Sequence, residues 1–162
     1  MIRKIETSDI PFCLEIYNYY IKNTTVTLEE ACLTLEEFGS RVRGICEKKE
    51  YCWLVYEENG EVLGYAYLDK FNPRSAYRIS CNLSIYVRTG TARRGIGRKL
   101  FEAVCAHACE HGIECIVSII TAENENSCRF HEKLGFTKAG ELPDVAFKFG
   151  RHIGVCFYLY HL

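Results

Sequence analysis

The chain has 162 residues, of which 48% are hydrophobic and 13% aromatic, with 20 basic and 21 acidic side chains. This apolar content is enough for one sizeable core, so we expect a single domain over residues 1–162. The near balance of charge argues against a nucleic-acid-binding surface. No apolar run follows the early cations and no stretch reaches membrane-spanning length, so we expect a cytoplasmic protein without a membrane span.

The ten cysteines are expected to be reduced thiols. A disulfide framework is typical of small secreted chains, and nothing in this sequence indicates secretion. Cys105 and Cys109, interleaved with His107 and His111, are the most crowded set. Residues four apart share one face of a helix, so the thiols and the imidazoles lie on different faces. We therefore predict no metal site, and interpret the set as small buried thiols beside exposed histidines.

The first fifty residues predict one strand and two helices. Residues 2–5 form the strand, and Ser8 or Asp9 then caps a helix whose apolar residues recur at helical spacing. After a polar stretch, Thr34 and Glu37 make a capping box for a second helix that ends near residue 49. The chain therefore begins β-α-α.

A β-hairpin and a long strand are expected next. Apolar residues 51–56 and 62–68 are joined by a turn that contains Asn59-Gly60, a pair that favours a tight turn. Residues 77–87 then alternate in character along a fourth strand. One face is apolar, and the other carries five side chains with polar groups: Arg78, Ser80, Asn82, Ser84 and Tyr86.

The second half of the chain alternates helices and strands. A helix over residues 97–111 precedes a short β-rich strand at 115–121, and a helix capped by Asn124 or Asn126 then ends at Gly135. A sixth strand follows directly, and the last run, VCFYLYHL, is apolar on both faces, as in a strand that is covered on both sides. The predicted order is β-α-α-β-β-β-α-β-α-β-β.

The junction between the fourth strand and the next helix, LSIYVRTGTARRGIGRKL, is the most informative stretch. Gly95 and Gly97 allow an anion to approach the loop amides closely, and the free N–H groups at the helix start face the same point. Four cations surround that point: Arg93, Arg94, Arg98 and Lys99. The spacing matches neither a P-loop nor a Rossmann fingerprint. We predict a phosphate cradle, with an ordinary strand-to-helix turn as the alternative.

This loop and the later NxxSxxFHEKLGF pattern resemble the cofactor segments of the GNAT acetyltransferase superfamily. Further segments, IYNYYIKNTTVT, RSAY, LSIYV and AFKFGRHIGVCFYLY, resemble the group that acetylates phosphinothricin, methionine sulfone and related amino acids. The resemblance covers nearly the whole chain. It implies an α/β (α+β) fold with a mixed, mostly antiparallel central sheet flanked by helices, acetyl-CoA as co-substrate, and a homodimer.

The resemblance also assigns residues to acetyl-CoA. It implies that the backbone of Ile85, Tyr86 and Val87 pairs with the pantetheine arm where two strands of the sheet separate. Asn124 matches the family's asparagine on the cofactor arm, and Lys133 lies where it can also touch the cofactor. The pyrophosphate is then held by the loop residues Arg93, Arg94, Gly95, Ile96, Gly97 and Arg98.

For the acceptor, the resemblance places Arg74 and Tyr77 against an amino acid, and a guanidinium fork suits the carboxylate of that substrate. The expected reaction is direct attack of a free amine on the thioester, with backbone N–H groups near Tyr86 and Val87 stabilising the carbonyl oxygen. In the C-terminal segment the group's Trp and Asp are replaced by His152 and Gly154, so the identity of the acceptor stays open.

A second departure concerns the catalytic base. Asn82 stands where the group carries a Glu, and an amide cannot accept the proton of an ammonium. His131 is the best titratable candidate, because its ordinary pKa of about 6.5 suits proton transfer at neutral pH. Tyr86 is a candidate acid. The alternatives are a helix-face histidine that supports the next strand and an aromatic ring that fills a strand surface. With Asn82 orienting a water, the proton passes to His131 or to bulk solvent.

Two other functions remain open from the sequence. A non-catalytic acyl-CoA-binding module would keep the phosphate cradle and lack the base, as Asn82 allows. A peptide or protein N-acetyltransferase would keep the chemistry and accept a larger amine. Arg74 with Tyr77 favours a small acceptor that carries a carboxylate. We therefore predict an acetyl-CoA-dependent N-acetyltransferase acting on a small amino-acid-like amine of the phosphinothricin or methionine sulfone type.

Overall fold

The computed structural model describes residues 1–91 and 95–162. Within these residues, seven strands form one mixed sheet in the order β1-β2-β3-β4-β5-β7-β6, and every neighbouring pair is antiparallel except β4 and β5. The strands are β1 Ile2–Lys4, β2 Cys52–Glu58, β3 Glu61–Lys70, β4 Ser80–Val87, β5 Cys115–Thr121, β6 Thr137–Lys148 and β7 Arg151–His161.

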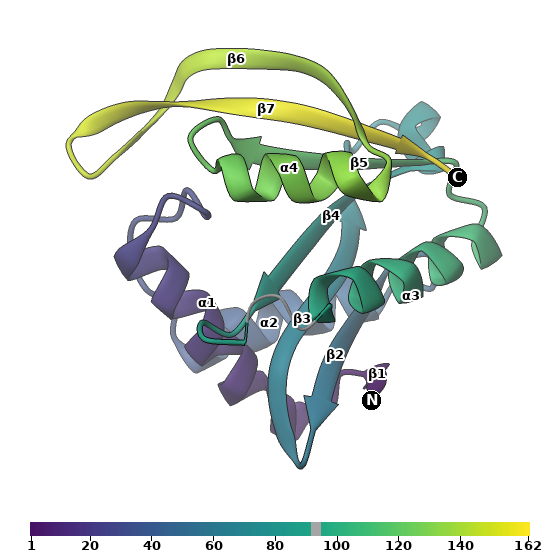
Figure 1. Cartoon of the computed structure of the whole chain (residues 1–162). Coiled ribbons are helices and arrows are strands. Elements are labelled where there is room, and N and C mark those ends of the chain that lie inside the picture. Colours follow the sequence, from purple (N-terminus) through teal and green to yellow (C-terminus); the bar gives the residue numbers. More distant parts are fainter. Residues whose placement is uncertain (92–94) are drawn as a thin grey trace.

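Four α-helices and two 3₁₀ helices complete the described residues (Figure 1). Their bounds are η1 Thr7–Asp9, α1 Ile10–Asn23, α2 Leu35–Cys46, η2 Ser75–Ile79, α3 Ile96–Glu110 and α4 Glu125–Leu134. The predicted mixed, mostly antiparallel sheet with flanking helices is confirmed. None of the helices in the described part of the chain is long and apolar enough to cross a membrane.

The local signals at α2 and at the first hairpin act as predicted. The Thr34 hydroxyl accepts a hydrogen bond from the Glu37 N–H at 3.2 Å, and the Glu37 carboxylate accepts one from the Thr34 N–H at 2.8 Å. Asn59 and Gly60 have φ values of 53° and 81°, so both central residues of the turn are left-handed, as a tight hairpin requires. Helix α2 ends at Cys46 rather than near residue 49.

The fourth strand begins later than predicted. Residues 75–79 form η2, held by a hydrogen bond from the Tyr77 N–H to the Arg74 C=O at 3.1 Å, and β4 starts only at Ser80. The alternation of residue types does not distinguish this turn from a strand, because residues 75–78 are exposed and no buried side chain there marks where the strand begins. The Tyr77 ring packs edge-on against Phe71 with centroids 5.4 Å apart. Arg74 and Tyr77 therefore lie on a turn that leads into β4.

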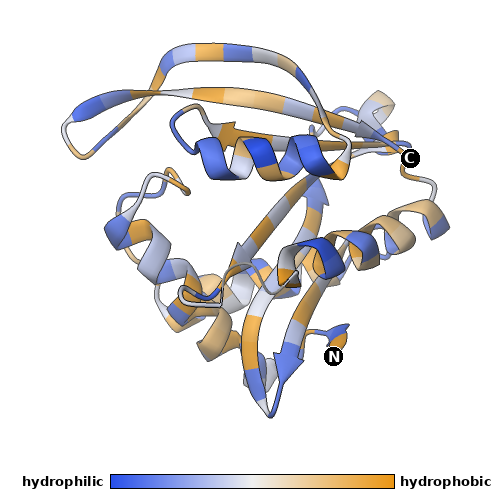
Figure 2. Ribbon diagram, in the orientation of Figure 1, coloured by the Kyte–Doolittle hydropathy of each residue, from blue (hydrophilic) through white to orange (hydrophobic). Residues whose placement is uncertain are grey.

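The sheet has a core on each face. Helix α3 and the end of α4 cover one face, where Leu100, Val104 and Leu134 pack against β3, β4 and β5. Helices α1 and α2 cover the other face of β2 to β4 with an aromatic core that includes Trp53 and Tyr65. Figure 2 shows β5 as an almost continuous hydrophobic strand, whereas α4 is largely hydrophilic. The central strands are thus buried from both sides.

The sheet forks between β4 and β5, the one parallel pair. These strands are paired from Ser80 opposite Cys115 to Asn82 opposite Val117, and the pairing then stops. Beyond this point β4 continues along β3 as far as Val87, while β5 continues along β7 (Figure 1). The fork leaves one edge of β4 without a neighbouring strand.

Candidate functional site

The unpaired edge of β4 offers backbone groups from alternate residues. The Arg88 N–H donates to the Leu63 C=O at 2.8 Å, so Arg88 and Leu63 form a hydrogen-bonded pair that continues the antiparallel β3–β4 ladder. Because such pairs alternate along a regular ladder, Tyr86 also directs its N–H and C=O toward β3. The polar groups of Ile85 and Val87 point the other way, into the fork. Of the three residues that the sequence nominates, Ile85 and Val87 therefore present backbone groups to the open edge.

A side chain from α1 reaches this edge of β4. The Tyr20 hydroxyl of α1 donates a hydrogen bond to the Val87 C=O at 2.6 Å. Burial raises the pKa of Tyr20, so the phenol stays protonated and keeps its role as donor. This contact engages the Val87 carbonyl and fixes α1 to the end of β4. No sequence motif marks Tyr20, because its partner is a backbone atom 67 positions away.

The start of α3 has the features of an anion site. Gly95 is the N-cap residue with a left-handed φ of 74°, and no side chain of the described residues caps the helix. The first free N–H groups of α3 therefore lack a side-chain acceptor, which favours an anionic ligand. Arg98 donates to the Lys133 C=O at 3.3 Å, while the Lys99 ammonium lies 5.6 Å from the centre of the Tyr56 ring. Arg93 and Arg94 lie outside the described residues.

The two glycines of the loop are needed for different reasons. Gly95 takes a left-handed conformation, and a Cβ there would meet nothing within 4 Å. A Cβ on Gly97 would lie 3.0 Å from Cζ of Phe130 on α4. Gly97 therefore permits close packing of α3 on α4, whereas Gly95 supplies the turn and leaves open space above the helix start.

Helix α4 starts beside the fork. The Asn124 side chain accepts a hydrogen bond from the Ser127 N–H at 3.2 Å and caps the helix, and the backbone N–H of Asn124 donates to the Thr121 C=O at the end of β5. Lys133 is exposed in the last turn. Asn124 is thus held at the mouth of the fork, while Lys133 lies near the start of α3 through the Arg98 contact.

His131 is placed inside the packing of α4. Only 6% of its surface is exposed, its Nδ1 lies 2.8 Å from the Ser127 C=O, and its ring packs edge-on against Phe136 at 5.0 Å. Burial lowers the pKa of His131, which favours the neutral ring. This environment matches the alternative in which the histidine supports the following strand.

Tyr86 lies in the aromatic core under α1. Its ring is 9% exposed and contacts Tyr17 at 5.1 Å and Tyr65 at 5.3 Å between centroids. Burial raises the pKa of Tyr86 well above its ordinary value. The ring fills the strand surface, which is the alternative considered for it.

Asn82 lies at the point where the fork closes. Its side-chain N–H donates to the Lys70 C=O at 3.1 Å, while its Oδ1 is buried and has no hydrogen-bond partner among the described residues. Arg74, the N-cap residue of η2, and Tyr77, within η2, are both exposed, and this turn leads directly into β4 at the end where Asn82 lies. Arg74, Tyr77 and Asn82 are therefore near one end of β4, opposite to the end that leads to α3.

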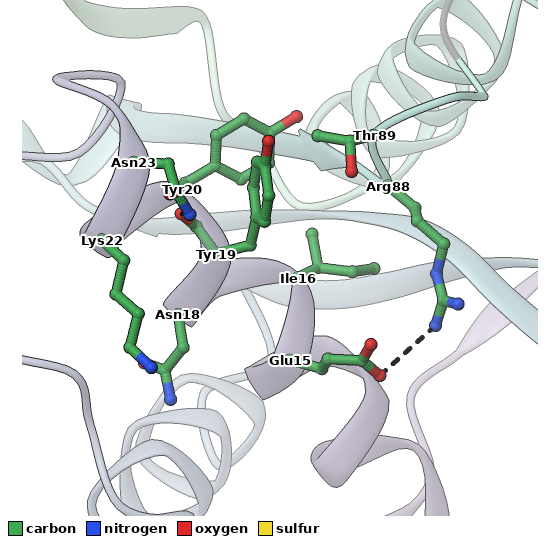
Figure 3. A pocket seen from close by; sticks show the side chains of 9 residues that line it. All are labelled: Glu15, Ile16, Asn18, Tyr19, Tyr20, Lys22, Asn23, Arg88 and Thr89. Carbon is green, nitrogen blue, oxygen red and sulfur yellow. Dashed lines mark hydrogen bonds and ion pairs between the residues drawn. The ribbon is translucent and has the colours of Figure 1, made fainter.

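Two cavities flank the open end of the fork. One, of about 430 Å³, lies between α1 and the end of β4, where Arg88 and Glu15 approach to 3.6 Å (Figure 3). The other, of about 310 Å³, includes Asn124 and lies between residues 23–26 and the β6–β7 turn. Neither cavity is lined by Arg74, Tyr77 or Asn82.

A polar contact closes one side of the second cavity. The Glu123 carboxylate accepts hydrogen bonds from the Thr25 hydroxyl and from both terminal nitrogens of Arg151. These hydrogen bonds, those from Arg151 first, lower the pKa of Glu123 to about 2. The contact joins the α1–α2 connection, the end of β5 and the β6–β7 turn, three segments that are far apart in the sequence.

The cysteine and histidine set on α3 differs in part from its interpretation. Cys109 is exposed rather than buried, and Cys105 and His107 are partly buried, because the side of α3 that carries them lies at the edge of the core. The His107 and His111 rings stack with centroids 4.0 Å apart. Within residues 1–91 and 95–162, no group of three or more His, Cys, Asp or Glu side chains is arranged to hold a metal ion.

The comparisons with known proteins agree on a family. Residues 2–156 match the family profile described as an acetyltransferase (GNAT) domain. A phosphinothricin N-acetyltransferase from Alcaligenes faecalis is 33% identical, over 94% of this chain and 77% of the relative. An L-methionine sulfoximine/L-methionine sulfone acetyltransferase from Pseudomonas paraeruginosa is 34% identical, over 96% of this chain and 91% of the relative.

A solved structure agrees with these relatives. The GNAT superfamily phosphinothricin acetyltransferase from Sinorhizobium meliloti, in complex with acetyl-CoA, superposes with a TM-score of 0.94 at 29% identity, covering 100% of this chain and 88% of that one. The forked sheet, the uncapped start of α3 and the sequence match point to the same conclusion. This chain belongs to the GNAT acetyltransferase family.

Proposed function

We propose that the protein transfers an acetyl group from acetyl-CoA to the primary amine of a small amino-acid-like substrate, of the phosphinothricin or methionine sulfone type. The observation that carries this proposal is the open edge of β4, which lies between an anion-binding helix start and a cluster of acceptor-side residues. The names of the relatives support the choice of acceptor class.

Several described residues offer groups that suit acetyl-CoA. Acetyl-CoA supplies an activated acetyl thioester when it is bound. The edge groups of Ile85 and the Val87 N–H can hydrogen-bond to an extended amide-containing arm, as an added strand would. Gly95 and the first N–H groups of α3 suit a pyrophosphate, and Asn124, the N-cap residue of α4, would contact the arm from the β5 side of the fork.

The acceptor-side residues suit a zwitterion. Arg74 offers a guanidinium fork to a carboxylate, and Tyr77 lies beside it on η2. The unpartnered Oδ1 of Asn82 can accept a hydrogen bond from the ammonium or from a water next to it. Asn82 then positions the amine without taking its proton. Because His131 is buried, we expect that proton to leave by another route.

The test is a panel of acceptors assayed for release of CoA from acetyl-CoA. The panel contains phosphinothricin, methionine sulfone, ordinary amino acids, their decarboxylated amines and a short peptide. We expect turnover with amino-acid-like acceptors and little with the decarboxylated amines or the peptide. Turnover on the peptide alone would identify a peptide N-acetyltransferase, and tight binding of acetyl-CoA without turnover would identify a binding module.

We also propose that two copies of the chain associate through the β6–β7 hairpin. This hairpin extends beyond the body of the sheet (Figure 1) and carries four exposed apolar side chains, each about half accessible: Leu142, Val145, Phe147 and Phe149. Such a surface favours association. Light scattering after size-exclusion chromatography tests the proposal, with Val145→Lys expected to shift a dimer toward the monomer.

A reducing, cytoplasmic setting is proposed from the chemistry of the thiols. All ten cysteines are free. Burial raises the pKa of Cys52, Cys81 and Cys105 to about 12, so these thiols stay protonated and unreactive. Thiol titration of protein taken directly from lysate is expected to find all ten groups reduced.

A further inference from the structure

A carboxylate lies directly across the sheet from Asn82. Asp69 of β3 is the register partner of Asn82 of β4 in an antiparallel pair. Side chains at such paired positions point to the same face and their Cβ atoms are about 4.5 to 5.5 Å apart. This is the face that carries Tyr65 and Tyr67, under α1 and α2. Asp69 and Asn82 are therefore neighbours on the acceptor side of the sheet.

The two side chains are held by the backbone of Lys70, the residue that follows Asp69 on β3. The Asp69 Oδ1 accepts a hydrogen bond from the Lys70 N–H at 2.6 Å, and the Asn82 side-chain N–H donates to the Lys70 C=O at 3.1 Å. Asn82 keeps a buried Oδ1 with no partner, and the Asp69 Oδ2 makes no hydrogen bond with any residue in the described ranges. Two acceptor oxygens are thus left over at the closed end of the fork.

The charges of Asp69 and Arg74 complement those of an amino acid. Asp69 is near the end of β3 and Arg74 is the first residue of the turn into β4, so both lie at the end of the strands where Asn82 is found. Burial is the main cause that raises the pKa of Tyr67 to about 12, and the Asp69 charge adds to it. A substrate with its carboxylate on Arg74 presents its ammonium toward a negative charge.

We propose that Asp69 is the catalytic base of the reaction, in place of a carboxylate on β4. This inference rests on the proposed N-acetyltransferase function and deepens it. Asp69 Oδ2 takes a proton from the acceptor ammonium while Asn82 Oδ1 holds a second N–H. The freed nitrogen lone pair forms the new C–N bond at the thioester carbonyl, and the C–S bond breaks with its electron pair on sulfur. The nitrogen loses its second proton as the amide forms, the released thiolate takes up one proton through solvent, and Asp69 returns its own proton to solvent, so that one proton is released overall.

The position of Asp69 distinguishes it from the two candidates that the sequence suggests. His131 is inside the packing of α4, and Tyr86 is inside the aromatic core. Asp69 is only partly buried and lies at a strand end. A carboxylate at this position supplies the basic group that the Asn82 amide lacks. It also lies next to Asn82, and a base must be within hydrogen-bond reach of the proton that it removes.

The test uses Asp69→Asn, which keeps an oxygen for the Lys70 N–H and removes only the basic group. We expect kcat with an amino-acid acceptor to fall about 100-fold or more, the usual contribution of a general base. Acetyl-CoA affinity should change less than twofold. The double variant Asp69→Asn with Asn82→Glu returns a carboxylate to β4, and its kcat should be at least about tenfold higher than that of Asp69→Asn alone. Glu61→Gln, an exposed acid at the other end of β3, is the matched control.

A second acceptor separates proton transfer from a structural role. An amino-acid analogue with a hydroxylamine nitrogen is already unprotonated at neutral pH, so Asp69→Asn should slow its acetylation far less. Equal losses on both acceptors, or a kcat within threefold of wild type on the amino acid, overturn the role of Asp69 and leave the proposed function intact. A wild-type protein that binds acetyl-CoA and acetylates no acceptor overturns the proposed function, and the base with it.

Discussion

The two ends of the β4 fork are built from different parts of the chain. The open end uses backbone: the edge groups of Ile85 and Val87, and the first N–H groups of α3 after Gly95. The closed end uses side chains, Asn82 and Arg74 among them. Backbone groups are the same in every sequence that adopts the fold, whereas side chains can be exchanged one at a time. The cofactor end is therefore common to a fold, and the acceptor end can change between its members.

The largest expected effect is at the open end. Gly95→Asp places a carboxylate at the uncapped start of α3 and a side chain on a left-handed residue, so acetyl-CoA affinity should fall about 100-fold or more. Gly97→Asp should also weaken binding, but through its collision with Phe130 it disturbs the packing of α4 as well. Calorimetric titration of acetyl-CoA measures both. Unchanged affinity in Gly95→Asp would remove the pyrophosphate from this loop.

The next effect is at the closed end. Arg74→Ala should raise the KM of an amino-acid acceptor about 10- to 150-fold, which corresponds to a charge-assisted hydrogen bond of about 1.5 to 3 kcal/mol. The KM of the matching decarboxylated amine should hardly change. Arg78→Ala, an exposed arginine on the same turn, is the control. Equal losses on both acceptors would place the carboxylate elsewhere.

A smaller effect is expected where α1 contacts the open end. Tyr20→Phe removes the hydrogen bond to the Val87 C=O and should lower the free energy of unfolding by about 1 kcal/mol. Urea denaturation measures the change. Tyr19→Phe alters the exposed neighbouring tyrosine and should change stability little. If both variants are as stable as wild type, Tyr20 does not fix α1 to β4.

The smallest effect concerns the pH dependence of stability. Burial lowers the pKa of His131 in the folded state, so below about 6.5 the unfolded chain binds more protons than the folded one. His131 therefore contributes stability that is present above pH 6.5 and lost as the pH falls. Burial also lowers the pKa of His107, so the comparison is between wild type and His131→Asn. The variant should lose less stability between pH 7 and 5.

Local signals in the sequence predict the tight turns and one helix start well. The capping box at Thr34, the Asn59-Gly60 turn and the left-handed Gly95 each depend on a few adjacent residues, and the structure follows them. The reason for Gly97 is different, because the atom that excludes a side chain there belongs to Phe130 on another helix. Sequence periodicity cannot show such a contact.

The closed end depends on pairing between strands. The alternation of residues 77–87 predicts that Asn82 and Tyr86 share a face, but it does not show that α1 covers Tyr86 or that Asp69 is opposite Asn82. Both facts follow from the register of β3 with β4. Similarly, His131 has the right chemistry for a base, and only the packing of α4 shows that its ring is buried.

Amide hydrogen exchange along β4 tests most directly whether the open edge receives acetyl-CoA. In the free protein, the Tyr86 N–H is bonded within the sheet, whereas the Ile85 and Val87 N–H groups face the fork. We expect acetyl-CoA to slow exchange at Ile85 and Val87 and to leave that at Tyr86 nearly unchanged. Binding of acetyl-CoA with no slowing at Ile85 and Val87 would contradict the account.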